Sequence, residues 1–166
     1  MNPLTRMAGA LAAGALTLLS LAGCDDQRIR ELEEDVSTEA DVRARFGEPE
    51  TIWPESDGGH TLEYNRQPAG HRNYMITIGP GGKMTALRQV LAPHNFERVR
   101  PGMDEEAVRR LLGKPAKRTP YVLKQETDWD WNWIDPPSRE MVFTATFGPD
   151  GRVKRAGSVE KLPDGR

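Results

Sequence analysis

The stretch that decides the fold is residues 104–115, DEEAVRRLLGKP, because it shows how one short helix begins, packs and ends. Asp104 suits a helix N-cap, and the acidic residues after it favour the positive end of the helix dipole. The apolar stripe of this helix consists of Val108, Leu111 and Leu112. Gly113 suits a helix terminus with positive φ, and Pro115 stops the helix. A helix of about ten residues is unstable alone, so it must pack on another element.

The same pattern occurs earlier in the chain, so the sequence contains an internal repeat. The helix positions that match at an offset of 66 are Val42, Phe46, Gly47 and Pro49 with Val108, Leu112, Gly113 and Pro115. Residues 63–65 match residues 130–132 at an offset of 67, and residues 79–82 match residues 148–151 at an offset of 69. The order is kept and the offset drifts by only three residues, which indicates a duplication. Thr38 is the N-cap expected in the first copy.

Alternating apolar residues predict strands after each helix. The alternating residues are Tyr74, Ile76 and Ile78 in the first copy and Met141, Phe143, Ala145 and Phe147 in the second. Each run ends in a Gly-Pro-x-Gly turn and resumes as a hairpin, and an earlier strand is expected at 60–66 and 128–133. We predict an α+β fold of two tandem helix-plus-three-strand units that share one six-stranded antiparallel sheet, with both helices on one face.

The amino terminus has the pattern of an export signal. Residues 7–23 follow Arg6, carry no charge and are mostly alanine, leucine and glycine. The run ends in LAGC, residues 21–24, which resembles the lipobox of bacterial lipoproteins. This resemblance implies cleavage between Gly23 and Cys24 and acylation of Cys24, for example with palmitate, which anchors the chain in a membrane. The alternative is a soluble exported protein whose only cysteine carries no lipid.

The charges divide the chain unevenly. Residues 25–35 hold six acids and two arginines, which favours an acidic tether over residues 24–35; the alternative is a first helix that packs on the next domain through Ile29 and Leu32. The whole chain has a net charge of −2 with both signs interspersed, which excludes a basic field for nucleic acid. The expected domains are a signal peptide (1–23), the tether (24–35), a first repeat (36–94), a second repeat (95–160) and a flexible tail (161–166).

Residues 95–115 resemble the signature segment of the SmpA/OmlA family, which includes the BamE-like outer-membrane assembly factors. The resemblance rests on Gly102-Met103 before the helix, Val108 within it and Gly113-Lys114-Pro115 after it. The first repeat matches more loosely, with Val36-Ser37 in place of Gly-Met. In duplicate, this domain type is similar to the fold of the β-lactamase inhibitory protein.

The family resemblance implies a small lipoprotein that faces the periplasm at the outer membrane. Its expected partners are envelope proteins, including the barrel-assembly machinery. Asp25 and Asp26, directly after Cys24, resemble the inner-membrane retention signal of enteric bacteria, so the inner membrane is the alternative location. The expected function is a binding or scaffolding module; the alternative is a binding inhibitor or regulator of a periplasmic enzyme.

No residue pattern indicates an enzyme, a metal site or a cofactor. His60, His71 and His94 lack metal-ligand spacing. Asp128 and Asp130 alternate with tryptophans, which is typical of the wet face of a strand rather than of an acid–base pair. We therefore expect no catalytic residue, no metal ligand and no cofactor.

Three tryptophans, Trp129, Trp131 and Trp133, lie on one side of the expected strand. Leu62 and Tyr64 hold the positions of Trp129 and Trp131 in the first repeat, which favours the core for these two. Arg66 holds the position of Trp133. We therefore expect Trp133 to be an exposed anchor for a partner, with Arg66 as its counterpart in the first repeat.

Overall fold

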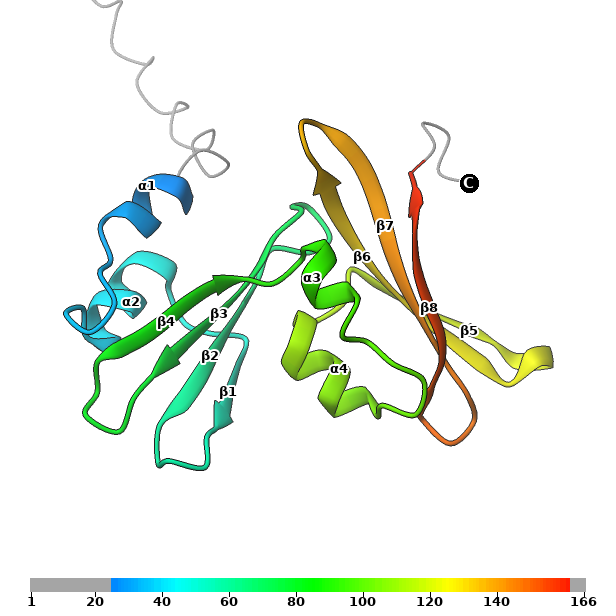
Figure 1. Cartoon of the computed structure of the whole chain (residues 1–166), viewed down its shortest axis with the longest axis horizontal. Coiled ribbons are helices and arrows are strands. Elements are labelled where there is room, and N and C mark those ends of the chain that lie inside the picture. Colours follow the sequence, from blue (N-terminus) through cyan, green and yellow to red (C-terminus); the bar gives the residue numbers. More distant parts are fainter. Residues whose placement is uncertain (1–24, 162–166) are drawn as a thin grey trace, which may run out of the picture. The chain divides into compact units, whose positions relative to one another are not determined.

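The computed structural model describes residues 25–161, in two units divided after Glu31 (Figure 1). The expected signal peptide, Gly23, Cys24 and residues 162–166 lie outside the described residues. The first unit contains α1 (Asp25–Arg30), a helix with Arg28 and Arg30 in its last turn. No helix within residues 25–161 is long and apolar enough to cross a membrane.

The second unit begins at Leu32, within the residues expected to form the tether. The backbone N–H of Asp35 donates to Met84 O at 2.7 Å, which ties this residue to a strand of the first repeat. The Glu34 carboxylate accepts from the Leu87 N–H at 3.0 Å. Residues 32–35 therefore belong to the folded repeat, because their backbone and acidic side chains pair with its edge strand.

Each repeat contains one eight-residue helix, which begins after the N-cap residue predicted from the sequence. The two helices are α2 (Glu39–Phe46) and α4 (Glu105–Leu112). Thr38 forms a capping box with Asp41, and the Asp104 carboxylate accepts from the Ala107 N–H at 2.8 Å. The predicted N-caps are therefore confirmed. Gly47 and Gly113 follow the helices with φ of +82° and +77°, as their positions require.

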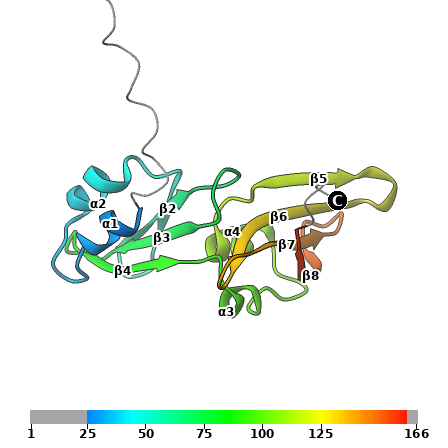
Figure 2. The ribbon, with the colours of Figure 1, turned by 90° about the horizontal axis from the view of Figure 1, so that it is seen from above.

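Each repeat forms one four-stranded antiparallel sheet, with its strands in chain order (Figures 1 and 2). The first sheet consists of β1 (Thr51–Pro54), β2 (His60–Asn65), β3 (Asn73–Ile78) and β4 (Met84–Gln89). The second consists of β5 (Lys117–Tyr121), β6 (Glu126–Asp135), β7 (Arg139–Phe147) and β8 (Val153–Glu160). A four-residue helix, α3 (Pro93–Phe96), precedes α4, and a 3-10 turn, η1 (Val122–Lys124), joins β5 to β6. The predicted α+β class is confirmed.

The prediction of three strands per unit in one shared sheet is wrong. β1 and β5 are additional edge strands. They were not predicted because they lack a buried apolar alternation and contain Pro54 and Pro120, which do not indicate a strand. The two sheets share no strand pairing; the repeats meet instead through side-chain contacts such as that of Glu63 in β2 with Arg109 in α4. The prediction that both helices lie on one face of a shared sheet is not confirmed.

The duplication is visible in matching contacts. Tyr64 Oη donates to Gly47 O, and Trp131 Nε1 donates to Gly113 O, each at 3.0 Å, so an aromatic side chain of the second strand caps the helix carbonyl in both repeats. The N-cap residues also match, since Thr38 bridges to Lys83 and Asp104 bridges to Arg152. Equivalent residues therefore carry out equivalent structural tasks in the two copies.

Each helix packs an apolar stripe on its own sheet. In the first repeat Phe46 contacts Tyr64 and Tyr74, with ring centroids 5.1 and 5.5 Å apart. In the second repeat α4 joins a buried aromatic cluster; its members include Val108, Leu112, Trp129, Trp131, Phe143 and Phe147. Trp129 and Trp131 are 2% and 0% exposed, which confirms their prediction as core residues.

Candidate functional site

The repeats meet through buried polar residues of the first repeat, which we call the joint: Glu63, Gln67 and Asn73 with their partners in the second repeat. Gln67 and Asn73 are 8% and 0% exposed, and Glu63 is fully buried. A buried polar group is costly unless it is hydrogen-bonded. The second repeat supplies those hydrogen bonds, so the two repeats are held in one arrangement.

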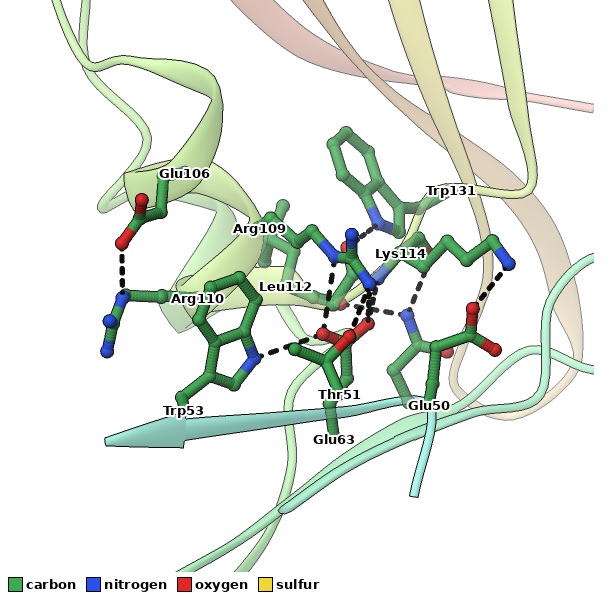
Figure 3. A network of polar contacts seen from close by, with 12 residues as sticks. Glu50, Thr51, Trp53, Glu63, Glu106, Arg109, Arg110, Leu112, Lys114 and Trp131 are labelled. Atoms are coloured by element: carbon green, nitrogen blue, oxygen red, sulfur yellow. Dashed lines mark hydrogen bonds and ion pairs between the residues drawn. The ribbon is translucent and has the colours of Figure 1, made fainter. Parts of the chain in front are cut away.

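Glu63 is the centre of the joint (Figure 3). Its carboxylate accepts from Lys114 N at 2.8 Å and from Trp53 Nε1 at 3.0 Å. Arg109 donates to the same carboxylate through Nε at 3.3 Å and through Nη2 at 3.4 Å, and to Thr51 Oγ1 at 2.7 Å. The carboxylate therefore links β1 and β2 to the end of α4.

Amide side chains complete the joint on both sides of Glu63. Asn73 Nδ2 donates to Leu112 O at 2.8 Å and to Lys114 O at 3.1 Å, which satisfies carbonyls left free at the end of α4. Gln67 Nε2 donates to Asn132 O, and Gln67 Oε1 accepts from Asn132 N, each at 2.9 Å. The Gln67 amide thereby hydrogen-bonds the backbone of Asn132 in β6 as the backbone of a neighbouring strand would.

A cavity of about 560 Å³ lies beside the joint, between the first sheet and the segment that contains α3 and α4. We call it the arginine cavity, because Arg88, Arg98 and Arg110 line it together with His94. Its apolar lining consists of Met75, Val90, Met103, Ala107 and Leu111, and the two remaining lining residues are Gln89 and Asn95. No acidic side chain is among these eleven residues.

A second surface feature is the hairpin tip, which we define as residues 121–124 between β5 and β6. Val122 and Leu123 are 82% and 102% exposed, and Tyr121 is 44% exposed. Isolated apolar side chains on a surface are ordinary, but three in succession form a patch of the kind that marks interaction sites. No acidic residue occurs in residues 114–125 around the tip.

An ion-pair cluster holds the base of the tip to β8. Glu126, the first residue of β6, accepts from Arg155 Nη2 at 2.8 Å and from Lys154 Nζ at 2.6 Å. Hydrogen bonds from Arg155 and then Lys154 lower the pKa of Glu126 from 4.5 to about 2. The lowered pKa means that the ion pairs favour the folded state wherever Glu126 is ionised.

We expect Glu126→Gln to lower the Tm at pH 7, with the difference from wild type shrinking as the pH falls from about 4.5 to 2. A folded-state pKa below the unfolded value adds stability above the unfolded pKa, and that stability is lost as the pH falls through the folded value. Circular dichroism melts at pH 7, 4 and 2 measure the effect. Glu140→Gln, in a long pair with Lys161 at 3.6 Å, is the control, and a pH-independent difference for Glu126→Gln contradicts the prediction.

Trp133 is not the exposed residue that the sequence predicts. It is 4% exposed, because Phe96 of α3 packs on it with ring centroids 5.0 Å apart. Its Nε1 is a buried donor without a hydrogen-bond partner within residues 25–161. Arg66 lies over the Phe46 ring of the first repeat, 5.7 Å from the centroid. A partner-binding role for Arg66 stays a prediction.

Sequence reasoning missed the joint and the arginine cavity. The signal in β2 was misleading, because Glu63 alternates with Leu62 and Tyr64 as an outward-facing strand residue would. The matching residue of the second repeat, Asp130, accepts from Thr144 Oγ1 of its own sheet at 2.6 Å. Comparison of the repeats therefore did not reveal that Glu63 is buried by a helix of the other copy.

No model of a known protein family matches the chain, and no curated protein matches it. Two solved structures are similar to it. A DUF4309 family protein (YjgB) from Bacillus subtilis is 19% identical, over 81% of this chain and 84% of its own, with a TM-score of 0.33. A "putative beta-lactamase inhibitor protein" from Streptococcus mutans is 10% identical, over 82% of this chain and 98% of its own, with a TM-score of 0.34. Likeness at this level carries no argument about function, and the resemblance to the SmpA/OmlA family stays a prediction.

Proposed function

We propose that this protein is a non-enzymatic binding module of the cell envelope, which docks a partner protein through its hairpin tip. The observation that carries the proposal is the exposure of Val122 and Leu123, at 82% and 102%, next to the half-exposed Tyr121. Complete burial of one valine or leucine side chain is worth about 1.5–3 kcal/mol. Two such side chains next to each other supply an exposed apolar surface of the kind that marks interaction sites.

The tip is presented in a fixed shape, which lowers the entropic cost of docking. Five residue pairs join β5 to β6, and the 3-10 turn of residues 122–124 closes the hairpin. Glu126 fastens the start of β6 to β8. A partner therefore meets a preformed apolar projection rather than a loop that must first be ordered.

The charges around the tip define the partner's surface. Lys124 lies within the tip, and Lys117 and Arg118 lie further along β5, where Arg118 is over the Trp129 ring with 3.9 Å to the centroid. A complementary surface is an apolar depression with an acidic rim, since opposite potentials favour encounter and register. The proposed envelope location rests on the predicted acylation of Cys24, with the periplasmic side of the outer membrane as the site and the inner membrane as the alternative.

A non-enzymatic role is supported by the kind of pKa shifts in the described residues. Glu34, Glu39 and Glu126 have lowered pKa values, and each is hydrogen-bonded to an arginine. For Glu39 desolvation, which raises the pKa, is the largest single influence, but the bonds from Arg43 and His60 outweigh it. Such shifts are typical of structural ion pairs rather than of an acid or base poised for catalysis.

A projecting tip also fits the alternative function, inhibition of a periplasmic enzyme, because enzyme clefts are concave. The two functions differ in what happens to the partner. A scaffolding contact leaves the partner active, whereas an inhibitor abolishes its activity at a one-to-one ratio.

We expect the double variant Val122→Asp, Leu123→Asp to recover at least about tenfold less partner than wild type in pull-downs from detergent-solubilised envelopes, because two anchors are replaced by charges. Quantitative mass spectrometry of the recovered proteins measures the loss. Titration of the recovered partner's activity with purified protein then separates scaffolding from inhibition.

The control is the double variant Val36→Asp, Val159→Asp, which adds the same two charges at aliphatic residues that are 58% and 63% exposed and lie outside the tip. It is expected to recover the partner as wild type does. Equal recovery by the tip variant and the control would overturn the proposal, and so would the absence of any protein enriched by wild type over the tip variant.

A further inference from the structure

We propose that the arginine cavity binds a small organic anion, with a carboxylate head held by Arg98 and a short apolar chain lying on Met75 and Leu111. Three arginines and His94 line the cavity, and no acidic residue is among its lining residues. Its volume of about 560 Å³ lies within the usual range of about 300–1,000 Å³ for ligand pockets. This site is separate from the hairpin tip and does not depend on the function proposed for it.

The three arginines of the cavity differ in whether they form ion pairs with acidic residues of the protein. Arg88 is paired with Glu34, and Arg110 Nε donates to Glu106 Oε1 at 3.0 Å. Arg98 donates to the neutral Asn95 Oδ1 at 3.2 Å and forms no ion pair within residues 25–161. Arg98 therefore has its full charge available for a ligand, and it is the primary anchor for the carboxylate.

Arg110 also lines the cavity, and its guanidinium is held at β1 of the first sheet. Its guanidinium lies over the Trp53 ring, 4.7 Å from the centroid, and Nη1 donates to Pro54 O at 3.4 Å. These contacts fix the plane of the guanidinium on the first sheet while Glu106, 65% exposed, is its only acidic partner among the described residues. An exposed pair of this kind is weak, so Arg110 adds positive charge to the cavity wall.

The apolar lining specifies the remainder of the ligand. Met75, Met103, Ala107 and Leu111 come from the first sheet, from the loop before α4 and from α4 itself. Methionine side chains adapt to ligands of irregular shape. A planar guanidinium matches a carboxylate in a two-pronged hydrogen bond, so an apolar chain that ends in a carboxylate satisfies both halves of the cavity.

The joint keeps this cavity formed in the absence of a ligand. Met75 pairs across the strands with Glu63, whose carboxylate holds Arg109 of α4. Arg110 and Leu111 follow Arg109 directly and line the cavity. Because the opposing walls are fixed by buried hydrogen bonds, the ligand need not order them on binding.

Isothermal titration of the full chain with decanoate, below its micelle concentration, tests the proposal. Decanol and decyltrimethylammonium are matched probes without the carboxylate, and decyl phosphate tests the head group. We expect decanoate to bind and the alcohol and the cation to bind at least about tenfold more weakly. Equal binding of decanol, or tighter binding of decyl phosphate, would overturn the assignment of a carboxylate site.

Two variants locate the site. Arg98→Gln is expected to weaken decanoate binding about tenfold, and Ala107→Phe, which fills the cavity, is expected to abolish it. Arg100→Gln removes an exposed arginine that does not line the cavity, so it is expected to bind decanoate as wild type does. The double tip variant Val122→Asp, Leu123→Asp is also expected to bind decanoate as wild type does. Unchanged affinity in a folded Arg98→Gln protein, verified by its circular dichroism melt, would overturn the proposal.

Discussion

Replacing Glu63 by alanine is expected to lower the free energy of unfolding by about 3–5 kcal/mol, the cost of removing one member of a buried ion pair. Glu63 is fully buried, and it is the common acceptor for Trp53, Arg109 and Lys114 N. Without its carboxylate these donors lose their acceptor inside the joint. The Arg109 side chain is 25% exposed, so partial solvation places the effect toward the lower end of the range.

Equilibrium urea unfolding measures this loss, and Glu50→Ala is the matched control. Glu50 also joins the first repeat to Lys114, but through Nζ at 2.6 Å and with both side chains well exposed, at 39% and 46%. Exposed pairs contribute about 0–1 kcal/mol, so Glu50→Ala is expected to cost less than about 1 kcal/mol. If Glu63→Ala costs no more than Glu50→Ala, the joint does not stabilise the fold in the way inferred from its geometry.

The second large effect is expected for Gly113→Ala, at about 2–6 kcal/mol. Part of this cost is backbone strain, since φ at Gly113 is +77°, which alone costs about 1–3 kcal/mol for alanine. The other part is local crowding. A Cβ on Gly113 would lie 2.9 Å from Asn73 Nδ2, the atom that donates to Leu112 O and Lys114 O. Displacing this buried amide removes its hydrogen bonds as well.

Gly47→Ala is the internal control for this prediction. Gly47 ends the first-repeat helix with φ of +82°, and a Cβ there meets nothing within 4 Å. Its substitution is therefore expected to cost only the strain of about 1–3 kcal/mol. Urea unfolding of both variants measures the difference, and equal losses would show that Asn73 moves aside without cost.

Local features of the fold were predictable because they depend on neighbours in the chain. The helix ends were predictable, because an N-cap or a terminal glycine acts within one helical turn. The residues concerned are the N-caps Thr38 and Asp104 and the glycine after each helix. The strand core of each hairpin was predictable from its apolar alternation. β1 and β5 were not, because an edge strand with little burial has no such alternation.

The candidate sites were less accessible to sequence reasoning. Trp133 was expected at the surface because its counterpart is Arg66, but α3 places Phe96 over the indole. The arginine cavity joins residues from β3 and β4 to residues of α3 and α4, and no periodicity relates them. The hairpin tip is contiguous in sequence, yet its exposure follows from the pairing of β5 with β6, which was not predicted.

The amino-acid sequence by itself determined the duplication, the two capped helices, the hairpins and the α+β class, because each of these follows from contacts between near neighbours or from a repeated pattern. Only the tertiary structure decided that the repeats keep separate sheets, since this depends on Glu63 and Asn73 meeting α4 residues at least 39 positions away. Equivalent residues also have different surroundings in the two copies. Glu63 is covered by the helix of the second repeat, whereas Asp130 is bonded to Thr144 within its own sheet.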